Sequence, residues 1–205
     1  RDFMKRYAEI LREMIIKGVN NGNKPLEGMK IVVDAGNGAG GFYAYDVLKP
    51  LGADIEGSVY LEPDGNFPNH APNPENAEAM ESISNAVKKS NADFGIIFDT
   101  DVDRAGCVGK GGFEINRNRL VALASKIALD SCPGGTIVTD SVTSDGLAEF
   151  IKENGGVHLR FKRGYRNVIN ESIRLNGLGQ DSQLAIETSG PVSYTHLTLP
   201  TSDLV

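Results

Sequence analysis

Apolar positions along the chain repeat with two different periods. Residues 2–17 carry an apolar side chain at every third or fourth position and end at Gly18, which predicts an amphipathic helix. Short runs with apolar residues predict strands at 30–34, 54–60, 94–98, 136–139, 158–161 and 184–187. Segments of helical spacing lie between them, at 42–51, 75–89, 117–130, 143–153 and 165–175.

Strands that alternate with helices predict parallel α/β layers. The pattern starts again after Lys110-Gly111-Gly112, so we expect an α/β protein with two tandem α/β/α domains and mixed, mostly parallel sheets. The expected domains are residues 1–110 and 111–191. Residues 192–205 have neither helical nor strand periodicity, and we interpret them as a tail that is not native to this fold.

Composition and charge narrow the classes of function. The 205 residues are 40% hydrophobic and 23% charged, enough for a sizeable core. The net charge of −6 argues against a nucleic-acid partner. No apolar run reaches the roughly 18 residues needed to cross a bilayer, so no membrane partner is expected. Residues 1–4 lack an initiator Met and a signal-peptide stretch, which suggests a fragment of a longer chain.

The two cysteines, Cys107 and Cys132, are too far apart in sequence for a local metal-ligand spacing. We expect both to be free thiols, as is usual in a reducing cytoplasm. A cytoplasmic location is therefore expected.

The most informative motif is the run Asp-Thr-Asp-Val-Asp-Arg at 99–104, directly after an apolar strand. In open α/β sheets, ligands bind beyond the carboxyl ends of strands. Three carboxylates this close repel one another unless a cation compensates them, and oxygen ligands suit Mg²⁺. We therefore predict Asp99, Asp101 and Asp103 as metal ligands. The alternative is a solvated acidic turn.

Two other acidic motifs fit less well. An EF-hand loop needs glycine and glutamate where Arg104 and Lys110 stand. An aspartyl phosphatase usually carries its D-x-D on the first strand, whereas this run follows the third. The planar fork of Arg104 suits a phosphate or carboxylate, and an ion pair with one of the neighbouring acids is the alternative.

A glycine-rich turn at 36–41 contains G-x-G-x-x-G between a strand and a helix, with Glu62 further along the chain. This pattern raises an alternative function, a dinucleotide-binding (Rossmann-like) oxidoreductase domain. Asp34 before the glycines and the proline-rich loop at 62–76 count against it. We favour a tight strand-to-helix turn that glycines make possible.

Taken together, these segments resemble the phosphoglucomutase and phosphomannomutase group of α-D-phosphohexomutases, over roughly residues 1–190. The similar segments are 32–40 (opening strand and turn of the second domain), 62–70 and 72–74 (a long loop), 98–104 (the metal loop D-G-D-x-D-R), 162–165 (K-x-G-aromatic) and 187–190 (E-x-S-G-H). Thr100 stands where the metal loop usually has glycine, and Pro191 replaces the histidine of the last motif.

The resemblance implies domains 2 and 3 of a four-domain enzyme that interconverts hexose 1-phosphate and hexose 6-phosphate, with glucose or mannose as the sugar. It implies a phosphoserine, a bisphosphate intermediate, Mg²⁺ as cofactor and a phosphosugar substrate. The serine loop, T-A-S-H-N-P, does not occur in this sequence. The first and fourth domains are therefore expected to be missing partners, and the chain alone is expected to be inactive.

The resemblance also implies roles for single residues. Arg104 would contact substrate or phosphoserine, and Lys162 would transfer a proton or stabilise charge near the sugar hydroxyl. Glu187 and Ser189 would hold sugar hydroxyls. The alternatives are an exposed strand-end lysine for Lys162 and a capping turn for the other two. His70 invites a catalytic interpretation, but we favour a structural hydrogen bond.

Overall fold

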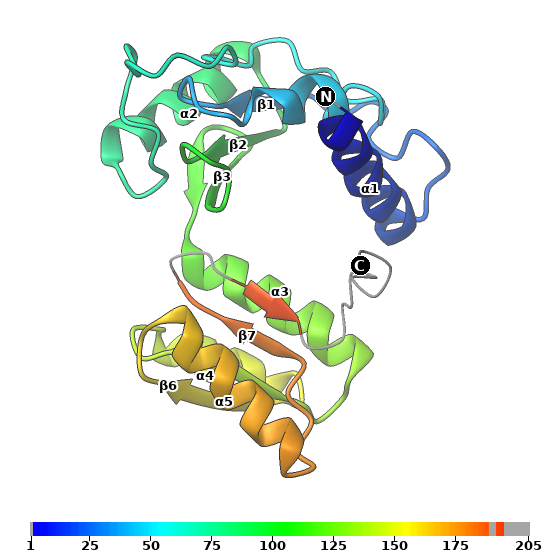
Figure 1. The fold of residues 1–205 in the computed structure, drawn as a ribbon, viewed down its shortest axis with the longest axis vertical. Helices are drawn as coiled ribbons and strands as arrows, with labels where there is room; N and C mark the ends of the chain where they lie inside the picture. Colours follow the sequence, from blue (N-terminus) through cyan, green and yellow to red (C-terminus); the bar gives the residue numbers. More distant parts are fainter. Residues whose placement is uncertain (1, 189–191, 195–205) are drawn as a thin grey trace. The chain divides into compact units, whose positions relative to one another are not determined.

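The computed structural model describes residues 2–188 and 192–194 (Figure 1). The chain divides into two compact units, residues 1–115 and 116–205. Each unit is built on a four-stranded sheet that helices cover. The predicted fold class, two tandem α/β/α domains with mixed sheets, is confirmed.

The first unit contains one mixed sheet in the order β1-β2-β3-β4. β1 runs parallel to β2, whereas the β2–β3 and β3–β4 pairs are antiparallel. Its elements are α1 (Asp2–Val19), β1 (Ile31–Asp34), the π-helix η1 (Tyr43–Leu48), α2 (Ala77–Ser90), β2 (Phe94–Phe98), β3 (Ala105–Gly109) and β4 (Phe113–Ile115).

Strand β1 of the first sheet is buried on both faces, and its successive side chains point to opposite sides. Val32 of β1 packs with Ile83 of α2 on one face. Its neighbour Val33 packs with Leu48 of η1 on the other. This alternation explains why β1 is a continuous apolar run, as expected for a strand between two helical layers.

Helix α1 adds an outer layer to the first unit, because it packs against η1 through Ala8, Val47 and Leu51. Its amphipathic pattern follows from this one-sided contact. Phe3 and Tyr7, on its first two turns, remain 75% and 41% exposed. None of the helices in the described part of the chain, α1 included, is long and apolar enough to span a membrane.

The second unit has the sheet order β6-β5-β7-β8. β5 runs parallel to both β6 and β7, and β8 is antiparallel to β7. The elements are α3 (Arg117–Ser131), β5 (Thr136–Asp140), α4 (Asp145–Glu153), β6 (Val157–Phe161), α5 (Tyr165–Gly177), β7 (Leu184–Ile186) and β8 (Val192–Tyr194). Parallel pairing therefore dominates this sheet.

The central strand β5 again has two apolar faces. Ile137 packs with Leu129 of α3 and Ile151 of α4. The next residue, Val138, packs with Val168 of α5. Helices therefore cover both sides of β5. Ligands of such sheets bind beyond the carboxyl ends of the strands, so the residues that follow β5 are candidates for a site.

The predicted strand over 54–60 is wrong as a continuous element. Only its two ends form isolated parallel bridges to the β1 region, at Asp54 and Val59. The middle turns instead, because Asp54 Oδ1 accepts the Glu56 N–H at 2.9 Å and Gly57 has φ +100°. A residue in that backbone region cannot continue a strand.

Three strands were not predicted from the sequence. β3 reads Ala-Gly-Cys-Val-Gly, with too few β-branched residues to stand out, but it pairs with β2 along its whole length. The pair Gly111-Gly112, with φ +85° and +80°, turns the β3–β4 hairpin. β8 lies in the expected tail, whose remaining residues, 195–205, are outside the described part. That the tail is foreign to the fold stays a prediction.

Cys107 provides a test of the β3 position. Both cysteines are free, and burial raises the pKa of the Cys107 thiol from 9.0 to about 11. Because the thiolate is the nucleophile, we expect iodoacetamide at pH 8 to label Cys107 in a Cys132→Ser chain roughly 100-fold more slowly when folded than in urea. Equal rates in both conditions, followed by mass spectrometry, would contradict the burial of this thiol in the sheet.

Candidate functional site

The acidic loop, residues 99–104, follows strand β2 directly and lies at the carboxyl edge of the first sheet. Asp99 follows its last residue and is fully buried, whereas Asp101 and Asp103 are exposed. One carboxylate oxygen from each residue lies within 4.8 Å of the other two. The structure thus brings the three predicted ligands together, and a set of carboxylate oxygens is suited to a hard divalent cation such as Mg²⁺.

Arg104 closes the loop onto its first residue. The Asp99 carboxylate accepts the Arg104 backbone N–H and its Nε–H, each at 3.0 Å, and lies 2.9 Å from a terminal guanidinium nitrogen. The same guanidinium lies 3.5 Å from both Asp103 and Asn73. The internal ion pair that the sequence suggested as an alternative is therefore present. The Arg104 side chain is still 37% exposed, and its contact with substrate stays a prediction.

The two ends of the acidic loop differ in pKa. Burial alone would raise the pKa of Asp99. Hydrogen bonds from the Arg104 backbone N–H and from Asp103, together with the positive charge of Arg104, outweigh the effect of burial, so the pKa of Asp99 is lowered. The hydrogen bond with Asp99, partial burial and repulsion from neighbouring carboxylates raise the pKa of Asp103. A cation among these groups would remove the repulsion.

The backbone of the acidic loop is strained at one position. Val102 has φ +70°, a region that β-branched residues rarely adopt, and such strain typically costs about 1–3 kcal/mol. Its side chain packs against the cluster that contains Phe98. Thr100, at the position where the related loop has glycine, does not have a positive φ. Threonine is therefore compatible with the backbone there.

The glycine turn at 36–41 packs directly on protein atoms. A Cβ on Gly38 would lie 2.8 Å from the Thr100 carbonyl oxygen, and a Cβ on Gly41 would lie 1.9 Å from that of Leu61. In a dinucleotide site, glycines leave room for the pyrophosphate. Here the space is already filled, which favours the tight-turn interpretation.

Asp34, the last residue of β1, is a fully buried acceptor beside this turn. Its carboxylate accepts the Gly36 N–H at 2.9 Å and the Ser82 hydroxyl at 2.6 Å, and both oxygens lie 3.0 Å from His70 Nε2. His70 therefore makes the structural hydrogen bond that the sequence analysis favoured. The sequence analysis did not identify the partners of Asp34, because they lie 36 and 48 residues away.

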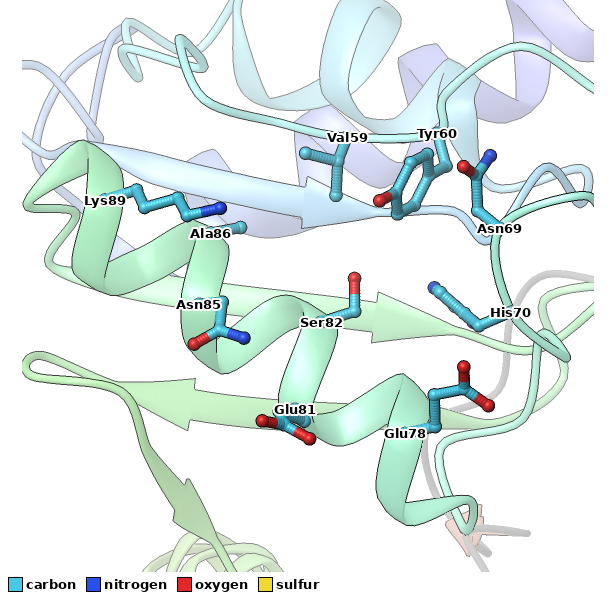
Figure 2. A pocket seen from close by; sticks show the side chains of 10 residues that line it. All are labelled: Val59, Tyr60, Asn69, His70, Glu78, Glu81, Ser82, Asn85, Ala86 and Lys89. Atoms are coloured by element: carbon cyan, nitrogen blue, oxygen red, sulfur yellow. The ribbon is translucent and has the colours of Figure 1, made fainter.

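A cavity of about 300 Å³ lies next to Asp34's partners. Figure 2 shows the Ser82 hydroxyl pointing from α2 towards the neighbouring strand, and His70 reaching in from its loop. The Tyr60 ring packs edge-on against the His70 ring, with 5.5 Å between centroids. None of the acidic-loop residues 99–104 lines this cavity. The two features are distinct parts of the first unit.

The carboxyl edge of the second sheet carries the other predicted residues. Lys162 follows β6 and Glu187 follows β7, and β5 lies between them and ends at Asp140. Lys162 is exposed, with Nζ 5.7 Å from the Phe161 ring centroid. Glu187 is only 5% exposed, and its carboxylate accepts the N–H of Gly164. A hydrogen bond thus connects the loop after β6 to the residue after β7.

Asp140 is a residue that the sequence analysis missed. It is fully buried and accepts the Val142 N–H at 3.1 Å, the Thr188 N–H at 3.0 Å and the Thr188 hydroxyl at 2.8 Å. Its place matches that of Asp34, since each ends the first strand of its unit and accepts the N–H two residues on. An aspartate directly after an apolar run was the available signal. Ser189 lies outside the described residues.

Both units match models of known domains. Residues 5–112 match the family model for phosphoglucomutase/phosphomannomutase, alpha/beta/alpha domain II. Residues 116–203 match the model for domain III of the same family.

Individual relatives carry corresponding names. A phosphomannomutase/phosphoglucomutase of Pseudomonas aeruginosa is 35% identical over 193 residues, which cover 94% of this chain and 39% of the relative. A phosphoglucomutase of Neisseria gonorrhoeae is 36% identical over 166 residues, which cover 81% of this chain and 35% of the relative. The chain therefore spans little more than a third of these relatives.

Solved structures share the fold. A phosphoglucomutase/phosphomannomutase family protein of Burkholderia thailandensis has a TM-score of 0.74 and 32% identity, covering 91% of this chain and 39% of that one. An N-acetylphosphoglucosamine mutase of Aspergillus fumigatus, in complex with GlcNAc-6P and magnesium, has a TM-score of 0.61 and 18% identity, covering 93% and 40%. At that identity, the second likeness concerns the fold alone.

The packing role of the glycine turn can be tested with a matched pair of substitutions. Gly41→Ala forces a methyl group against the Leu61 backbone, whereas Gly65→Ala meets nothing within 4 Å. We expect Gly41→Ala to lower the free energy of unfolding by about 1–3 kcal/mol and Gly65→Ala to change it by less than about 1 kcal/mol. Urea denaturation would measure both, and similar values would contradict the role of the turn in packing.

Proposed function

The chain belongs to the phosphoglucomutase/phosphomannomutase family, and on that premise we propose that it forms the second and third domains of a phosphohexomutase. The reaction would interconvert hexose 1-phosphate and hexose 6-phosphate, with glucose or mannose as the sugar. The names of the relatives support this substrate class. Because the chain spans little more than a third of them, the activity is proposed for a polypeptide that also has a first and a fourth domain.

The observation that carries the proposal is the acidic loop at the end of β2. Asp99, Asp101 and Asp103 offer three oxygen ligands within 4.8 Å of one another, and we assign them to Mg²⁺. When bound there, the ion would neutralise charge on phosphoryl oxygens during transfer. The related fold described with a sugar phosphate and magnesium is consistent with this assignment.

Arg104 would have two tasks in this site. Its backbone and side-chain N–H groups hold the Asp99 carboxylate in place. The exposed part of its guanidinium is available for a phosphate or for the phosphoserine, which would come from the first domain. A planar guanidinium suits such a contact because it can donate two parallel hydrogen bonds.

The second unit would bind the sugar. Lys162 is exposed at a strand end, and we assign it to accept a proton from the attacking hydroxyl or to stabilise the charge that develops there. Glu187 and Ser189 would hold sugar hydroxyls, and Gly164 fixes the Glu187 carboxylate. After the first transfer, the bisphosphate would reorient and return its other phosphate to the serine. The isolated chain would not catalyse this cycle, because it lacks that serine.

Metal binding can be measured on the chain alone. We expect Mg²⁺ at millimolar concentrations to shift the backbone amide signals of residues 99–104, and Asp101→Asn to weaken this response at least roughly 10-fold because it removes one charged ligand. Asp130→Asn, an exposed carboxylate on α3, should leave the titration unchanged. Equal responses of the two variants would argue against the assigned ligands.

Activity requires the whole enzyme. We suggest a chimera in which this chain, with an E-x-S-G-H loop restored, joins the first and fourth domains of the Pseudomonas aeruginosa relative. Lys162→Ala and Glu187→Gln should each lower kcat/KM by roughly 10²-fold or more, as expected for a proton-transfer group and a substrate contact. Lys152→Ala, on the exposed side of α4, is the matched control. A folded chimera without turnover of glucose or mannose phosphates would refute the proposed function.

A further inference from the structure

We propose that Asp34 and His70 are positioning residues of the acidic loop and act on it through the glycine turn at 36–39. The inference rests on the proposed metal role of Asp99, Asp101 and Asp103. It assigns a role to a buried Asp–His pair that the mechanism above does not use.

The ring of His70 has an acceptor at each nitrogen. Nδ1 lies 3.0 Å from the Ala71 carbonyl oxygen, which can only accept, so Nδ1 carries a hydrogen. Nε2 lies 3.0 Å from both oxygens of the Asp34 carboxylate. Both ring nitrogens therefore lie within hydrogen-bond distance of an oxygen.

This pair is almost completely removed from water. The His70 and Asp34 side chains are 2% and 0% exposed. A buried polar pair is stable only when its remaining hydrogen-bonding positions are also filled. For Asp34, the Gly36 N–H and the Ser82 hydroxyl fill them, at 2.9 and 2.6 Å. The pair therefore ties together β1, the glycine turn, the loop of His70 and α2.

The glycine turn packs closely against His70 and is also hydrogen-bonded to Asp34. Gly36 has φ +52°, and a Cβ there would lie 2.8 Å from Pro72 Cβ and 3.0 Å from His70 Cε1. No side chain fits in that space, so the turn rests directly on the His70 loop. Loss of the imidazole would remove a partner of Asp34 and a wall of the turn together.

The far end of the turn contacts the acidic loop. The Ala39 N–H donates to the Thr100 carbonyl oxygen at 2.9 Å, and Gly38 packs on the same peptide. Thr100 lies between two of the proposed ligands, Asp99 and Asp101. A shift of the turn would therefore move the peptide that sets the spacing of the two carboxylates.

Asp101 depends most on this support. Arg104 anchors the Asp99 carboxylate from inside the loop, whereas the Asp101 side chain is exposed. The strained Val102 follows it directly, and such a backbone persists only where its surroundings hold it in place. The Ala39–Thr100 hydrogen bond is one such restraint, and the glycine turn connects it to Asp34 and His70.

The test uses the full chain and two measurements. Amide hydrogen exchange at Ala39 reports the turn-to-loop contact without metal, and Mg²⁺ titration reports the ligand geometry. We expect Asp34→Ala and His70→Ala each to accelerate Ala39 exchange at least roughly 10-fold and to weaken Mg²⁺ binding by about the same factor, the usual effect of losing a supporting residue of a metal site. The effect of the double variant should be smaller than the product of the two single effects, because His70 acts in part through Asp34.

Two variants separate positioning from general destabilisation. Val108→Ala removes core packing in β3 without touching the turn, so it should speed exchange across the sheet yet leave Mg²⁺ affinity within about twofold. Asp34→Asn keeps an acceptor for Gly36 and offers a donor to a neutral His70. It should keep Ala39 protected nearly as in wild type.

The outcomes are distinct. The inference is overturned if the exchange rate of the Ala39 amide is unchanged in His70→Ala. It is also overturned if that rate rises only by the same factor as the exchange rate of the Ile97 amide in β2. A wild-type chain without any saturable Mg²⁺ response refutes the metal assignment, and Ala39 exchange then decides the positioning role by itself. If Asp34→Ala does not fold, His70→Ala and Asp34→Asn decide the question.

Discussion

Each unit depends on a carboxylate that is buried at the end of its first strand. Asp34 and Asp140 are both fully buried, and a buried carboxyl group without hydrogen-bond partners destabilises the fold by about 1–3 kcal/mol or more. The hydrogen-bond partners come from distant parts of the chain: His70 in its loop and Ser82 on α2 for Asp34, and Thr188 after β7 for Asp140. The requirement for donors therefore brings the loops at the carboxyl edge of each sheet to defined positions.

Backbone segments approach one another closely around Asp34. In the first unit the glycine turn fits between the buried pair and the Thr100 peptide because its residues have no side chains where other backbone atoms lie. The acidic loop can then hold a strained Val102 and three carboxylates in one place. The pKa of Asp99 is lowered and that of Asp103 is raised, because Arg104 holds the first carboxylate while neighbouring carboxylates repel charge on the second.

The two units contribute different chemistry to the proposed reaction. The first offers oxygen ligands and Arg104, which suit a metal ion and a phosphate. The second places Lys162 and Glu187 on either side of β5, at one edge of its sheet. The proposed phosphosugar substrate would use both sets, because it would need contacts to its phosphate and to its hydroxyl groups.

The amino-acid sequence by itself determined the elements that are buried on two sides and the motifs whose members are neighbours. The middle positions of strands β1, β2 and β5 are apolar because helices pack on both sides of them, and the three acids of the acidic loop lie within five residues. Only the tertiary structure decided β3, whose glycine-rich sequence becomes a strand through its pairing with β2, and the turn that interrupts 54–60. It also decided the partners of Asp34 and Asp140, because hydrogen bonds between residues 36 to 48 positions apart exist only once the chain has folded.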